Sequence, residues 1–356
     1  MSEIKDLVEM SKYAGERFDL VQAGGGNSSV KFNNGEMIIK ASGFLLSDLT
    51  QESGYSRVFT KQIAAIVKNK TILNTTEKRE RESLTSQLVK DATIDKNNRP
   101  SIETLLHSFL LKYTLHTHPI VVNMIVIQKN WKDILGSLFS NDEVVFVEYK
   151  TPGIELALAL AKELKGFKSI PSIIFLQNHG LIVTSLHKHE IKTVTEYVLE
   201  KIEGYLKLEM SRYKTTNEIT YLLNSMENSE NISYLSEDKY LHEMLLKNKE
   251  LYLKTPFCPD SLVYCGIQAV EIKDVFDLKS LEEYKEKYFE LPKVIIVKKN
   301  LYFIAPNIKK AKEMEEVFKF HIMVLRQNTK RDINFLELDE LAYLSNWEAE
   351  KYRQKR

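Results

Sequence analysis

Two strand-turn-strand patterns constrain the fold of this chain most strongly. Residues 28–40 hold two alternating runs on either side of Asn33-Asn34-Gly35, which is typical of a β-hairpin. Residues 170–185 hold two more strand-like runs, which break at Asn178-His179-Gly180. Helical patterns interleave with these strands at residues 4–18, 152–166 and 186–214. The sequence therefore predicts an α/β fold.

Composition limits the classes of partner. The chain has 356 residues, of which 43% are hydrophobic, so it can build a substantial core. Its net charge of +1 lacks the basic excess of a nucleic-acid binder, and we expect a small-molecule partner and no nucleic acid. The charged N-terminus does not resemble a signal peptide, and no apolar run is long enough to span a membrane. We therefore expect a cytoplasmic protein with no membrane partner.

The chain is expected to form two domains, residues 1–215 and 235–356, joined through a polar boundary at about 214–233. The second domain is expected to be a smaller α/β unit. Its two cysteines, Cys258 and Cys265, are expected to be reduced thiols, because their spacing does not make a metal-ligand set. Within the first domain, residues 69–98 predict a solvated helix, and Pro100-Ser101 predict the start of another helix that reaches about 113.

Histidines stand at positions that suit a metal site. On a strand, His116 and His118 project from the same face, and His179 follows another predicted strand. Three imidazoles leave an open coordination position, which is the ligand count of a catalytic metal. Taken alone, the His116-Thr117-His118 pattern is equally compatible with one hydrogen-bonded and one exposed histidine. His187 and His189 lie at the start of a charged helix and are expected to be surface residues.

Glu103 and the glycine-rich segment 24–26 each allow two interpretations. Glu103 lies in the first turn of its predicted helix, where a carboxylate is favoured by the helix dipole whatever its role. The alternative is a general acid/base near the metal. Gly24-Gly25-Gly26 lacks both the spacing of a dinucleotide-binding fingerprint and the lysine of a P-loop. By itself it favours a flexible turn over a phosphate cradle.

Five motifs together resemble the class II aldolase/adducin family over about residues 5–215: GGGNSSVK…IIKASG, PSIETLLH, LHTHP, EYKTPG and LQNHGLIV. The resemblance is nearest to the aldolase part of bifunctional rhamnulose-1-phosphate aldolase/dehydrogenases. It implies a central, mostly antiparallel sheet between helical layers, with a smaller C-terminal α/β extension. The segments PFCPDSLVYCG and LSNWEAEKYR resemble that extension less diagnostically.

The resemblance also implies roles for particular residues. It assigns Zn²⁺, or another divalent ion such as Mn²⁺ or Co²⁺, to His116, His118 and His179, and acid/base catalysis to Glu103. Tyr149 matches a family position and is either a proton donor or a packed aromatic. The substrate phosphate is expected at Gly26, Asn27, Ser42, Gly43 and Ser101. Where some members have a second serine, this chain has Ile102, which removes one phosphate contact.

A divalent ion on three neutral imidazoles would chelate a hydroxyketone and stabilise its enediolate. The resemblance therefore implies reversible aldol cleavage of a ketose phosphate to dihydroxyacetone phosphate and an aldehyde. Decarboxylation or epimerisation of a related sugar phosphate at the same site stays open, as does a non-catalytic, adducin-like interaction role. A homotetramer is expected by analogy. In the tail, Trp347, Glu348 and Arg353 either reach an active site or serve in docking.

Overall fold

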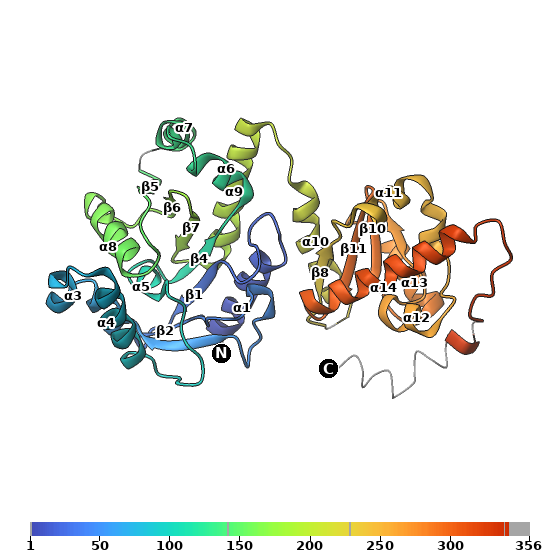
Figure 1. Cartoon of the computed structure of the whole chain (residues 1–356), viewed down its shortest axis with the longest axis horizontal. Helices are drawn as coiled ribbons and strands as arrows, with labels where there is room; N and C mark the ends of the chain where they lie inside the picture. Colours follow the sequence, from blue (N-terminus) through green and yellow to red (C-terminus); the bar gives the residue numbers. More distant parts are fainter. Residues whose placement is uncertain (1, 141, 228, 338, 342–356) are drawn as a thin grey trace. The chain divides into compact units, whose positions relative to one another are not determined.

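The computed structural model describes residues 2–140, 142–227, 229–337 and 339–341. These form two compact units that divide between Met210 and Ser211, which we call unit 1 and unit 2 (Figure 1). The tail residues Trp347, Glu348 and Arg353 lie outside the described residues. In the part of the chain that is described, no helix combines the length and the apolar character that crossing a bilayer would require.

Unit 1 is built on a seven-stranded sheet with the order β3-β2-β1-β4-β7-β6-β5. Every neighbouring pair is antiparallel except β5 and β6, which confirms the mostly antiparallel sheet. The first hairpin, β1 to β2, turns at the predicted asparagines, and the Asn34 side chain accepts a hydrogen bond from the Glu36 N–H. The strands are β1 Asn27–Lys31, β2 Glu36–Lys40, β3 Tyr55–Phe59, β4 Tyr113–Thr117, β5 Val144–Val147, β6 Ile173–Leu176 and β7 Gly180–Ser185.

Helices cover both faces of this sheet (Figure 1). Successive residues of β7 alternate between the faces: Val183 packs in one core and Ile182 in the other. The first core is closed by α1 Ser2–Gly15, α6 Ile120–Val126, α7 Trp131–Leu138 and α9 Lys188–Leu206. The second is closed by α2 Thr60–Ile66, α3 Lys70–Asn74, α4 Lys78–Asp91, α5 Thr104–Ser108 and α8 Ile154–Glu163.

Unit 2 is a smaller α/β unit with a four-stranded sheet of order β8-β11-β10-β9, in which β9 and β10 are parallel. Tyr252, Phe303 and Phe318 pack in its core, and Cys258 and Cys265 are both free thiols, as predicted. Its strands are β8 Ile232–Leu235, β9 Val270–Ile272, β10 Val294–Val297 and β11 Asn300–Ala305. Its helices are α10 Ser211–Met226, α11 Lys239–Lys247, α12 Pro259–Cys265, α13 Leu278–Tyr288 and α14 Ile308–Gln327.

The boundary between the units differs from the prediction. The helix expected over 186–214 ends at Leu206, because Lys207 adopts the left-handed conformation with φ +54°. The polar segment expected as a linker is instead α10, which buries Tyr213, Ile219 and Leu223 along one face. Unit 2 therefore begins at Ser211 and not near 235.

Two helical predictions in unit 1 have different outcomes. Residues 69–98 hold the predicted helix as α4, and the shorter α3 precedes it. The helix expected from Pro100 is the short α5, and Glu103 is its N-cap and not part of its first turn. The Ser108 hydroxyl bonds back to the Leu105 carbonyl at 2.7 Å, which competes with continuation of the helix.

Candidate metal centre and active site

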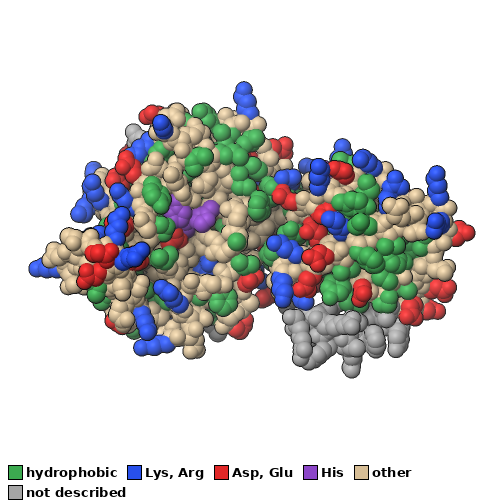
Figure 2. All heavy atoms as spheres, viewed as in Figure 1, with side chains coloured by type: hydrophobic (Ala, Val, Ile, Leu, Met, Phe, Trp, Pro, Cys, Tyr) green, Lys and Arg blue, Asp and Glu red, His purple; other side chains and the backbone are tan. Residues whose placement is uncertain are grey.

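Three histidines from two neighbouring parts of the unit 1 sheet converge. His116 lies in β4, His118 directly follows β4, and His179 lies in the tight turn from β6 to β7. The Nε2 atom of His116 is 3.1 Å from that of His118 and 3.3 Å from that of His179. Histidine side chains are visible together at the surface of unit 1 in Figure 2. The predicted trio is thus brought together as one group that could hold a metal ion.

The state of His116 suits metal binding. Its side chain is fully buried, and its Nδ1–H donates to the Leu181 carbonyl at 3.0 Å. This contact fixes the tautomer and leaves the lone pair of Nε2 directed at the other two rings. Burial lowers the pKa of His116 to about 3, so the ring is neutral at physiological pH. The ring nitrogens of the three histidines face one another, which fits a divalent cation.

Two glycines let the backbone approach this group. A Cβ atom on Gly25 would lie 2.8 Å from Nδ1 of His118, and one on Gly180 would lie 2.3 Å from the Thr117 carbonyl oxygen. The N–H of His118 donates to the Leu20 carbonyl at 2.9 Å, shortly before the glycine-rich segment. Gly25 therefore serves close packing against a ring of the metal centre, and this segment is more than a flexible turn.

Glu103 faces the histidines. Its Oε1 lies 3.4 Å from Nε2 of His116 and 3.3 Å from Nε2 of His179, and its side chain is only 4% exposed. Although it is the N-cap residue of α5, its carboxylate makes no capping hydrogen bond. Burial favours the neutral acid, but the imidazoles of His116 and His179 outweigh burial and lower the pKa of Glu103. The carboxylate is directed at the histidines and makes no capping hydrogen bond, and its role as an acid/base stays a prediction.

Asn27 joins Glu103 to the glycine-rich segment. Its Nδ2–H donates to Oε2 of Glu103, and strand pairing places Asn27 opposite His116. Among the described residues, the buried Oδ1 of Asn27 has no hydrogen-bond donor. Gly26 precedes it with φ +71°, and a Cβ there would lie 2.9 Å from the His116 carbonyl oxygen. Asn27 therefore orients the carboxylate and offers an unsatisfied acceptor beside it.

The other residues predicted to bind phosphate differ in accessibility. Ser42 and Gly43 are exposed, Gly43 has φ +91° with open space around it, and the Ser42 N–H donates to the Arg99 carbonyl at 2.8 Å. Ser101 is buried, and its Oγ accepts the Glu103 N–H at 3.2 Å, which fixes the backbone in front of α5. Ile102 is 54% exposed. A role in phosphate binding stays a prediction for these residues.

Lys40 was missed by the sequence interpretation. It ends β2 and is only 3% exposed, and its Nζ donates to the carbonyls of Phe44 at 2.8 Å and Gly24 at 3.2 Å. Burial lowers the pKa of Lys40, while the Glu103 carboxylate opposes this shift. No carboxylate of a described residue lies within ion-pair distance of it. A cation held between the glycine-rich segment and the Ser42-Gly43 turn suits an anionic substrate group.

Tyr149 is not a packed aromatic, because its side chain is 54% exposed. Its backbone N–H donates to Oε1 of Gln177 at 3.0 Å, and no described contact joins its side chain to the histidine group. A proton-donor role for it stays a prediction. His187 and His189 are exposed with their rings stacked at 5.8 Å, which confirms their assignment to the surface.

The sequence was compared with known proteins. The family described as class II aldolase and adducin N-terminal domain matches residues 5–206. The chain belongs to this family. Class II aldolases depend on a divalent metal, and the histidine group of this chain could hold one. The matched region corresponds to unit 1, so nothing in this match bears on unit 2.

Three individual proteins each match between 57% and 59% of this chain. The uncharacterized oxidoreductase YuxG of Bacillus subtilis is 27% identical over 222 residues, which cover 59% of this chain and 30% of YuxG. The chain therefore spans less than a third of that relative. The class II aldolase domain of a conserved Thermoplasma acidophilum protein is 25% identical, with 57% and 93% of the two chains covered and a TM-score of 0.49. The L-fuculose-1-phosphate aldolase of Thermus thermophilus is 17% identical, with 58% and 94% covered and a TM-score of 0.39.

Proposed function

We propose that unit 1 is a divalent-metal-dependent lyase that reversibly cleaves a ketose phosphate to dihydroxyacetone phosphate and an aldehyde. The observation that carries this proposal is the placement of Glu103, whose carboxylate lies between Asn27 and two of the three convergent histidines. A non-catalytic, adducin-like role would not need this constellation. We expect His116, His118 and His179 to hold the metal.

Zn²⁺ or another divalent ion, when bound, would supply positive charge to the carbonyl and hydroxyl oxygens of the substrate. Residues of the chain would carry out the proton transfers and bind the substrate phosphate. In cleavage, the carbon–carbon bond next to the carbonyl-bearing fragment breaks, and its electron pair stays with that fragment. Glu103, in its protonated form, delivers a proton to this carbon, and in the reverse direction its carboxylate removes that proton.

The second proton transfer takes the hydroxyl proton of the departing fragment and so forms the aldehyde. We assign this step to Tyr149 by its match to the family position. Its 54% exposure leaves it available to a neighbouring subunit, which agrees with the proposed homotetramer. We expect the phosphate to be bound by Gly26, Asn27, Ser42, Gly43 and Ser101, with Lys40, which contacts the Gly24 and Phe44 carbonyls, supplying positive charge.

The direct test is to supply the metal-loaded chain with ketose 1-phosphates and to measure triose phosphate release by coupled reduction. Dihydroxyacetone phosphate and short aldehydes test the reverse direction. Assays with sugar-acid phosphates, in which carbon dioxide is measured, distinguish decarboxylation from aldol cleavage. The stereochemistry of the recovered substrate distinguishes epimerisation. Triose phosphate release that Glu103→Gln abolishes is the expected result. Failure to cleave or to condense any of these substrates would contradict an aldolase. A cytoplasmic location stays a prediction.

A further inference from the structure

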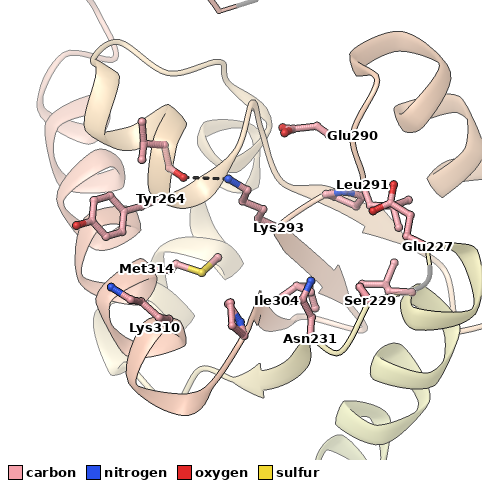
Figure 3. A pocket seen from close by; sticks show the side chains of 14 residues that line it. Glu227, Ser229, Asn231, Tyr264, Glu290, Leu291, Lys293, Ile304, Lys310 and Met314 are labelled. Carbon is pink, nitrogen blue, oxygen red and sulfur yellow. Dashed lines mark hydrogen bonds between the residues drawn. The ribbon is translucent and has the colours of Figure 1, made fainter. Parts of the chain in front are cut away.

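Unit 2 holds a cavity of its own, with a volume of about 330 Å³ (Figure 3). Its walls come from α10, α12, β11, α14 and the segment before β10. Much of the lining is apolar and includes Leu223, Val263, Ile304 and Met314. Ligand pockets of proteins have volumes of about 300–1,000 Å³ and combine apolar walls with a few polar groups. This cavity therefore suits a small molecule at the lower end of that range.

Two opposite charges face this cavity without a direct ionic partner. The Nζ of Lys293 donates to the Val263 carbonyl at 2.9 Å, and no described carboxylate lies within 4.0 Å of it. Oε1 of Glu290 is buried without a hydrogen-bond donor among the described residues. Both side chains lie close to Gly266, since a Cβ there would be 3.3 Å from Oε1 of Glu290 and 3.6 Å from Cγ of Lys293. Figure 3 shows the Glu290 carboxylate and the Lys293 ammonium in the same part of the view, with the ammonium turned toward the Val263 carbonyl.

The other charges on the cavity wall are already paired. Lys310 lies 2.8 Å from Glu313, and Glu227 lies 3.1 Å from Lys285. Burial raises the pKa of Glu290, and the Lys293 ammonium and a backbone hydrogen bond with Ile267 oppose that shift, but no ion pair joins Glu290 and Lys293. A ligand that brings one positive and one negative group would satisfy both.

We propose that this cavity binds an apolar α-amino acid in its zwitterionic form. The ligand carboxylate would accept hydrogen bonds from the Lys293 ammonium, the ligand ammonium would pair with the Glu290 carboxylate, and the apolar side chain would lie against Met314 and Ile304. A sugar phosphate fits poorly here, because its hydroxyls would meet apolar walls and its phosphate would be repelled by Glu290. The site is therefore distinct in chemistry from the metal centre of unit 1.

Three matched probes test this assignment on the full chain by calorimetry: L-leucine, N-acetyl-L-leucine and L-leucinamide. N-acetylation removes the positive charge, and the amide removes the negative charge. We expect L-leucine, or another member of a series with valine, methionine and phenylalanine, to bind saturably. The two derivatives of the binding amino acid should each bind at least about tenfold more weakly, because each loses one charge-assisted hydrogen-bonded contact.

Variants assign each charge to its residue. Lys293→Met should weaken amino acid binding at least about tenfold and abolish the preference for the free acid over the amide. Glu290→Gln should abolish the preference for the free amine over the N-acetyl derivative. Lys310→Met is the matched control, because its ammonium lines the same cavity but is already paired, and it should change the affinity less than about threefold.

NMR of labelled methyl groups tests where the amino acid binds. In a chain with ¹³C-labelled methionine and isoleucine methyl groups, the amino acid should shift the signals of Met314 and Ile304 and leave Met37 of unit 1 unchanged. The same spectra report whether each variant is folded. Absence of saturable binding by all four amino acids would overturn the proposal. So would binding that a folded Lys293→Met variant retains at wild-type affinity.

Discussion

Replacement of Glu103 by glutamine isolates the proton-transfer step from metal binding. Glutamine has nearly the volume of glutamate, and its amide oxygen can still accept the hydrogen bond from Asn27 Nδ2. The side chain would remain about as far from His116 and His179 as the 3.4 and 3.3 Å of the native carboxylate. The substitution removes the capacity to carry a proton together with the negative charge, so the metal content of each variant is measured alongside its rate. General acid–base catalysis contributes a factor of about 10²–10⁴, or about 3–5 kcal/mol of barrier.

The assay needs no aldehyde. The metal-loaded chain, incubated with dihydroxyacetone phosphate in D₂O, should exchange a carbon-bound proton for deuterium, which NMR follows directly. We expect Glu103→Gln to slow this exchange by about 10²–10⁴-fold at unchanged metal content. Glu36→Gln, on the same sheet but paired with Arg57 at 3.3 Å, is the control and should exchange at the wild-type rate. A metal-loaded Glu103→Gln variant that exchanges within tenfold of wild type would refute the role of Glu103.

Three further predictions address other parts of the chain. Lys40→Met should raise the KM for a phosphorylated substrate about 10–100-fold and leave turnover of the phosphate-free ketose unchanged; equal effects on both would contradict phosphate binding. Gly25→Ala should weaken metal binding about 10–100-fold, because its Cβ would lie 2.8 Å from a His118 nitrogen, whereas Gly24→Ala meets open space and should leave calorimetric metal affinity unchanged. Burial lowers the pKa of His321 to about 4, so the unfolded state takes up its proton first as the pH falls. Unfolding free energy should thus decrease by up to about 1.4 kcal/mol per pH unit between about 6.5 and 4, and His321→Phe should remove this contribution in urea titrations; identical pH profiles would contradict it.

Local patterns predicted both hairpins of unit 1 and the histidine trio, but not β3. The asparagine-glycine turn fixes the first hairpin, and the spacing of His116 and His118 on one strand needs only the period of a β-strand. The third histidine was found because a strand ends directly before Asn178-His179-Gly180. These features depend on residues that are close in sequence, so the sequence carries them directly.

Local sequence patterns could not predict contacts between residues that are distant in the sequence. Asn27 and Glu103 are 76 positions apart, and their hydrogen bond exists only because β1 pairs with β4 while α5 packs against the sheet. Without that contact, Glu103 could not be distinguished from a helix cap. Lys40 looks like an ordinary strand end, and its burial depends on the Gly24 and Phe44 carbonyls.

The helix α10 was predicted as a linker, although its sequence carries a helical pattern. The segment taken as a linker is polar on average, yet Thr216, Ile219 and Leu223 recur at helical spacing and are buried in α10. The helical spacing of these positions indicates the helix, although the mean polarity of the segment does not. The short α5 ends at Ser108, whose hydroxyl bonds back to the Leu105 carbonyl before the chain reaches β4.

The metal content of purified protein tests the central claim most directly. After purification with divalent metal present and exhaustive dialysis, elemental analysis should find one divalent ion per wild-type chain. His116→Ala, His118→Ala and His179→Ala should each lose it, because each removes one of the three convergent nitrogens. The exposed His189 provides the control, and His189→Ala should keep the ion. A wild-type chain without bound metal, or a His116→Ala chain that retains it, would contradict the account.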